Sequence, residues 1–112
     1  MLLAEEVNRI EPAYLRLHLL SPDARPALHE LFGRYVESRL ETYRSLPNMA
    51  EAEKEMANSK KIQEEIWTEA VAATRLPESH PSAGLLLLPA LNNMSSGQHR
   101  SWLLFSGSLS LQ

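Results

Sequence analysis

The stretch Leu85–Leu91, with the sequence LLLLPAL, is the most apolar part of this 112-residue chain. It is too short to cross a bilayer, which requires about 20 apolar residues. It is also too apolar for a helix that lies on a solvated surface. We therefore expect this block to close a helical sequence and to require a partner surface, either on the preceding helices or outside the chain.

The composition indicates one small domain with few candidate catalytic or metal-binding groups. The chain has no cysteine, which removes disulfides, thiolate metal sites and cysteine nucleophiles. Its 11 basic and 14 acidic residues give a formal net charge of −3, so electrostatics does not favour a nucleic-acid partner. The sequence shows neither a signal peptide nor a window of transmembrane length. We expect a chain that is made in the cytoplasm and is soluble or peripheral.

Helical periodicity begins at the start of the sequence. Apolar residues within 2–20 recur in steps of four and three, which is the spacing of a helical seam. Pro12 interrupts this pattern and predicts a kink between Asn8 and Pro12, or a helix that starts near Pro12. The seam consists of Leu3, Val7, Ile10, Tyr14 and Leu17.

A second helix is predicted to end near Leu46. Its start has two interpretations, because Asp23 can cap it with Pro26 in the first turn, or Ser21 can cap it with Pro22 at the first position. The spacing of its apolar residues predicts one broad buried face. This face consists of Leu28, Leu31, Phe32, Tyr35, Val36, Leu40, Tyr43 and Leu46.

A third, longer helix is predicted from about Met49 to Leu76, after a break at Pro47. Its first half is rich in strong helix formers but poor in apolar residues, which is compatible with a projection beyond the core. Its second half has a clear apolar face. The residues of that face are Ile62, Ile66, Trp67, Ala70, Val71 and Thr74.

A fourth helix is predicted from Ser82 to about Met94, with Pro89 as a kink. After Met94 the helical period is lost, and we expect residues 95–112 to form a disordered or weakly packed tail. The domain prediction is a helical domain over 1–94 and a non-matching tail over 95–112. The predicted fold class is all-α, an antiparallel bundle or elongated hairpin of three to four helices.

The sequence lacks the spacing of a catalytic or metal site. His29 and Glu30 begin a zinc-protease helix motif, but Gly33 occupies the position of the second histidine. The other histidines lie on separate predicted elements, and the glutamates of the third helix are expected to form a solvated face. We therefore predict a non-enzyme without cofactor or metal, and an enzyme with carboxylate or histidine chemistry is the least favoured alternative.

An ordered series of short segments covers about residues 2–94. These segments are Ala4–Ile10, Ala13–Leu17, Leu20, Arg34–Tyr35, Arg39–Glu41, Tyr43, Glu65–Trp67 and Leu86–Asn92. The series resembles a bacterial membrane-protein family of unknown function that carries a bestrophin-like domain. Members of that family have the pattern of a helical soluble segment between two pairs of transmembrane helices.

The resemblance implies that this chain is the soluble middle segment of an inner-membrane parent. It implies a role in assembly or gating. Two departures from the family pattern concern the ends of the chain, because no helix pair precedes residue 2 and residues 95–112 do not match. A truncated gene, or a frameshift near codon 95, would account for both departures.

Partner prediction follows from the helix faces. We expect self-association or a helical protein partner, with no nucleic acid and no small-molecule substrate, and membrane contact only through the parent protein. The alternative function is a free-standing helical interaction module that uses the third helix. The predicted interaction surface consists of Met49, Met56, Leu85, Leu86, Leu87, Leu88 and Leu91.

Overall fold

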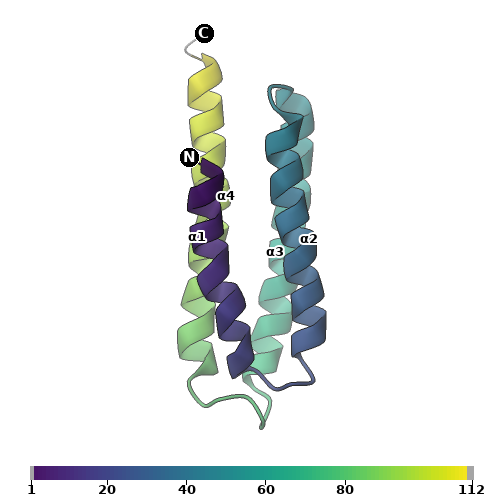
Figure 1. The fold of residues 1–112 in the computed structure, drawn as a ribbon, viewed down its shortest axis with the longest axis vertical. Helices are drawn as coiled ribbons and strands as arrows, with labels where there is room; N and C mark the ends of the chain where they lie inside the picture. Colours follow the sequence, from purple (N-terminus) through teal and green to yellow (C-terminus); the bar gives the residue numbers. More distant parts are fainter. Residues whose placement is uncertain (1, 111–112) are drawn as a thin grey trace.

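The computed structural model describes residues 2–110, which form an elongated helical bundle of 54 × 19 × 18 Å. Its α-helices run alternately down and up the long axis (Figure 1). The all-α prediction is confirmed, since residues 2–110 contain helices, turns and loops but no strand. The elements are α1 (Leu2–Leu15), the 3-10 helix η1 (Arg16–Leu19), α2 (Arg25–Ser45), α3 (Met49–Thr74) and α4 (Ala83–Ser110).

The helices pack as two close antiparallel pairs, α1 with α4 and α2 with α3 (Figure 1). Arg9 joins the first pair, because its Nη1 donates to Asn93 Oδ1 at 3.1 Å and to Ser96 Oγ at 2.8 Å. Direct packing between α1 and α2 is much less extensive than packing within either pair. This difference leaves a groove between α1 and α2.

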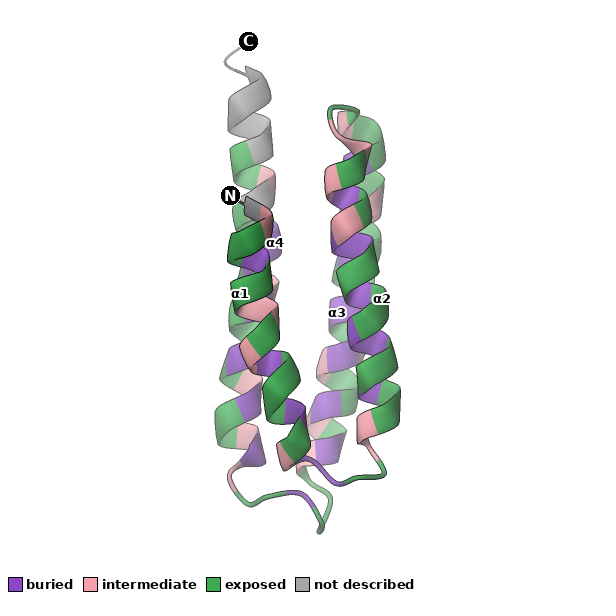
Figure 2. Ribbon diagram, viewed as in Figure 1, coloured by how far each residue is buried: buried purple, intermediate pink, exposed green. Residues whose placement is uncertain are grey.

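The apolar core lies where the two pairs face each other, and Figure 2 shows the buried positions of all four α-helices turned inward. Burial of a large apolar side chain stabilises the fold by roughly 1.5–3 kcal/mol, so this cluster supplies most of the driving force for folding. Its members are Ala13, Leu17, Leu20, Leu28, Leu31, Phe32, Tyr35, Ile62, Ile66, Ala70, Ala73, Ala83, Leu87, Ala90, Leu91 and Met94.

The two loops at one end of the bundle are bonded to each other. Ser21 donates its backbone N–H to Ser79 Oγ at 2.8 Å, and Ser79 Oγ donates to the carbonyl of Ala73 at 2.6 Å. The side-chain hydroxyl of Ser21, the group that would cap α2, donates instead to Glu78 Oε2 at 3.3 Å. The predicted caps at Ser21 and Asp23 are both wrong, since Ala24 holds the cap position without a side-chain bond. The prediction of Pro26 in the first turn is confirmed.

Two predicted helix boundaries are also wrong. A helix start near Pro12 is excluded, because α1 begins at Leu2 and continues through Pro12. The predicted end of the fourth helix near Met94 is wrong, because α4 continues to Ser110. In the first part of this extension, Gln98 Nε2 donates to the buried Tyr35 hydroxyl at 2.9 Å and Arg100 Nε donates to Glu5 Oε2 at 3.1 Å, so it contacts both α2 and α1. Residues 111 and 112 of the predicted tail lie outside the described residues.

Candidate functional site

The predicted interaction surface is divided between different parts of the bundle. Met49 and Met56, both half-buried, belong to the first half of α3, whereas the leucine block opens α4 at the opposite end (Figure 1). Leu85 is 78% exposed and Leu86 is also exposed. The remaining leucines face inward or sideways: Leu87 and Leu91 are fully buried in the core, and Leu88 packs against it.

An apolar surface that the sequence analysis placed in the core lies instead along α1. Within the predicted seam, Val7 is 48% exposed and Tyr14 is 42% exposed. The face that enters the core carries Glu6 and Ala13 of α1 and the last seam residue, Leu17 of η1, which is fully buried. The seam is therefore divided: Leu17 lies in the core, whereas Val7 and Tyr14 border the space between α1 and α2.

This space is an open groove of about 440 Å³ between α1 and α2. Its α1 wall carries the seam residues from Leu3 to Tyr14 and also Leu15, which is 60% exposed, and its α2 wall carries Val36 and Leu40. Val36 and Leu40 were also predicted to face the core. The full lining is Leu3, Glu6, Val7, Ile10, Glu11, Tyr14, Leu15, Val36, Arg39 and Leu40.

A buried ion pair lies at the base of the groove. Arg39 Nε donates to Glu6 Oε1 at 2.7 Å, and Arg39 Nη2 donates to Glu6 Oε2 at 3.0 Å. The Arg39 side chain is 1% exposed and the Glu6 side chain 4% exposed. A bidentate ion pair of this type fixes the relative position of two helices, because a planar guanidinium matches a carboxylate in only a few orientations.

Further polar contacts extend this ion pair into a layer across the bundle. Arg39 Nη1 donates to Ser59 Oγ of α3 at 3.5 Å, and Ser59 Oγ lies 2.6 Å from Ser38 Oγ. On the α4 side, Gly97 is packed beneath α1, where an added Cβ would lie 3.1 Å from Arg9 Cδ. The polar contacts of the layer thus join α1, α2 and α3.

The sequence analysis missed Glu6 and Arg39 because charged residues are almost never fully buried unless they are paired. One signal was present in the spacing. Glu6, Ala13 and Leu17 are separated by seven and four residues, so they share one helix face. The sequence around Arg39 on α2 carries no comparable signal. Arg39 borders the predicted apolar face of that helix, where an arginine is usually exposed.

Tyr35 is buried beside this layer, and its hydroxyl accepts a hydrogen bond from Gln98 Nε2 at 2.9 Å. Burial raises the pKa of Tyr35 from 10.0 to about 12, although the positive charge of Arg39 opposes the increase. As the pH rises, the Tyr35 hydroxyl therefore loses its proton at a lower pH in the unfolded chain than in the folded chain. The contribution of Tyr35 to stability is complete below pH 10 and is lost as the pH rises toward 12.

We expect the free energy of unfolding to fall between pH 10 and pH 12 by roughly 1 kcal/mol per pH unit from Tyr35 alone. Urea denaturation followed by circular dichroism at several pH values measures this slope. The Tyr35→Phe variant is the control, because it retains the other titrating tyrosines. Equal slopes in both proteins would contradict the assignment.

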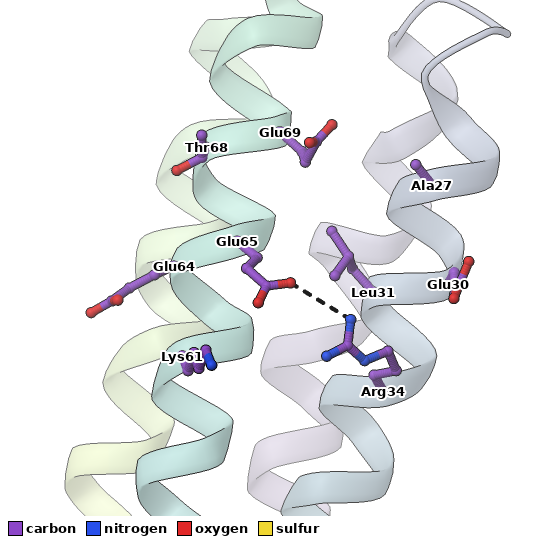
Figure 3. A pocket seen from close by; sticks show the side chains of 9 residues that line it. All are labelled: Ala27, Glu30, Leu31, Arg34, Lys61, Glu64, Glu65, Thr68 and Glu69. Carbon is purple, nitrogen blue, oxygen red and sulfur yellow. Dashed lines mark ion pairs between the residues drawn. The ribbon is translucent and has the colours of Figure 1, made fainter.

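A second hollow lies between α2 and α3, where charged side chains line both walls (Figure 3). Arg34 Nη1 is 3.6 Å from Glu65 Oε2, and both side chains are largely solvated. Figure 3 shows Glu64 directed away from this pair, so the carboxylates do not converge on one point. Within residues 2–110, no group of three or more acidic or histidine side chains is arranged to hold a metal ion.

Comparison with known proteins adds no relationship to this geometry. No protein-family model, curated protein or solved structure matches the chain. In the described part of the chain, no helix is both long enough and apolar enough to cross a membrane.

Proposed function

We propose that this chain is a non-enzymatic helical segment that acts in protein assembly, and that the groove between α1 and α2 is its contact surface. The observation that carries the proposal is the exposed seam on α1, which includes Val7 and Tyr14. Apolar side chains in steps of three and four are the pattern through which helices pack against other helices. Contiguous exposed apolar patches of this kind typically mark an interaction site.

The resemblance described above supports a wider context for this role. We propose that the chain is the soluble part of a bestrophin-like bacterial inner-membrane protein and is itself cytoplasmic or peripheral. In that setting, contact through the groove would join subunits or transmit a movement between them. This assembly or gating role requires no cofactor and no substrate.

A second candidate function is a free-standing interaction module that uses the first half of α3. Met56 favours it, because this half-buried side chain lines an open hollow between α3 and α4 together with His99 and Trp102. Flexible methionine side chains adapt well to partner surfaces. The groove remains the stronger candidate because its walls are more continuously apolar.

Site-specific photocrosslinking in cells that express the natural gene tests the proposal. A photoreactive phenylalanine analogue at Val7 should give a crosslinked protein species, because this side chain lies in the contact surface. The same analogue at Ala72, which is exposed on α3, is the matched control and should give none. Crosslinks from Met56 but not from Val7 would favour the second candidate. Absence of crosslinks at Val7 would contradict the proposal.

A further inference from the structure

We propose that the occupant of the groove is the same face of a second copy of this chain. The two copies are related by a two-fold axis parallel to the bundle, so that α1 of each copy lies over α2 of the other. This inference rests on the proposed function, because it assumes that the groove is a protein contact surface. It adds the identity of the partner and the arrangement of the helices.

The two walls of the groove have the same repeat. On α1, the seam from Leu3 to Tyr14 follows steps of four, three and four. On α2, Val36 and Leu40 of the groove wall continue a line through His29 and Gly33, which lie outside the groove lining, and the four positions follow the same steps. Helices with this repeat pack side chains of one into spaces between side chains of the other. A face with one such stripe on each helix is therefore complementary to itself when α1 and α2 are exchanged.

The contacts within one copy determine the levels at which the stripes meet. The Glu6–Arg39 ion pair joins α1 and α2 at one level, and the stacked rings of Tyr14 and His29, with centroids 5.2 Å apart, join them about two turns away. A two-fold axis parallel to the helices keeps these levels unchanged. In the dimer, α1 of one copy thus meets α2 of the other in the same antiparallel register that the chain already uses internally.

Gly33 is an independent observation on the α2 stripe. Glycine is unfavourable inside a helix, and an added Cβ at Gly33 would have no neighbouring atom within 4 Å. Nothing in a single copy requires a glycine there. The proposed dimer supplies a reason, because Gly33 lies at about the level of Glu11. The exposed Glu11 side chain of the second copy would approach the α2 backbone at this point.

The charges near the groove are also compatible with a second copy. Glu11 is the exposed carboxylate of the α1 wall, and exchange of the helices would bring it close to His29 of the second copy. On α2, Arg44 is already paired with Glu37 at 3.1 Å and Glu41 at 3.5 Å. Because the border carries both signs, it does not select a strongly acidic or strongly basic partner.

The size of the face limits the expected affinity. The 14 residues of α1 span roughly 21 Å, and two adjacent helices present a face about 20 Å wide. Stable complexes bury about 800 Å² on each partner, and this face of roughly 420 Å² is about half of that area. We therefore expect a weak, reversible dimer with a dissociation constant on the order of 100 µM.

Sedimentation equilibrium over loading concentrations from about 1 µM to about 1 mM measures this dimer directly. Gly33→Glu is the test variant: its added side chain has open space in one copy, but its charge would be buried in the dimer. We expect the dissociation constant of this variant to be at least about ten times that of the wild type. Ala72→Glu adds the same charge on α3 and should leave the dissociation constant unchanged. Val36→Glu is a second test on the same wall, and circular dichroism verifies folding of each variant.

A wild-type chain that remains monomeric at every concentration would overturn this inference. Equal dimerisation of the wild type and the Gly33→Glu and Val36→Glu variants would also overturn it, because the dimer would then use another face. The proposed function fails separately. If Val7 crosslinks to a different protein while the purified chain is monomeric, the groove is still an assembly surface and only the second copy is excluded.

Discussion

Replacement of Arg39 by alanine should lower the free energy of unfolding by about 3–5 kcal/mol, because it removes the guanidinium that neutralises the buried Glu6 carboxylate. Urea denaturation followed by circular dichroism measures this change. Arg44→Ala is the matched control. It removes a solvated guanidinium that pairs with Glu37, and such surface pairs contribute at most about 1 kcal/mol.

The double variant Glu6→Leu/Arg39→Met separates the charge from the packing. If the loss in Arg39→Ala comes from a buried carboxylate that is no longer neutralised, removal of both charges should recover most of the lost stability. A double variant that is as unstable as the single one would instead attribute the loss to packing. A small effect of Arg39→Ala, comparable to that of Arg44→Ala, would contradict burial of the pair.

The second large effect is expected within the leucine block. Leu87→Ala should lower the free energy of unfolding by about 2–5 kcal/mol, because the Leu87 side chain is fully buried and its removal leaves a cavity. Leu85→Ala makes the same chemical change two positions earlier, at a side chain that is 78% exposed, and should change stability by less than about 0.5 kcal/mol. Thermal and urea denaturation of both variants provide the measurement. Similar losses at both positions would show that the block packs differently.

The architecture was predictable because its signals are strong and local. Apolar residues at helical spacing, interrupted near Pro22, Pro47 and Pro77, predict successive antiparallel helices, and the structure confirms the all-α fold. The face of α1 that enters the core was not predictable from hydropathy. A carboxylate at Glu6 occupies the core because Arg39 of a different helix neutralises it, and no local pattern reports a partner 33 residues away.

The exposure of the groove residues was not predictable for the same reason. Val7, Tyr14 and Val36 have the spacing of core residues, so a sequence alone does not distinguish an exposed seam from a buried one. The extension of α4 beyond Met94 depends on tertiary contacts as well. Arg100 and Gln98 contribute to it through Glu5 and Tyr35, which belong to helices that lie much earlier in the sequence.

Because α1 pairs with α4, the two ends of the sequence depend on each other in the folded chain. Arg9 binds Asn93 at a sequence separation of 84 residues, and Arg100 binds Glu5 at a separation of 95. Bringing segments together over such a separation costs more chain entropy than forming the α2–α3 hairpin, so the hairpin contacts can form first and α1 docks late. A cut or an early stop within α4 would therefore release α1 at the other end of the chain, although α1 itself would be intact.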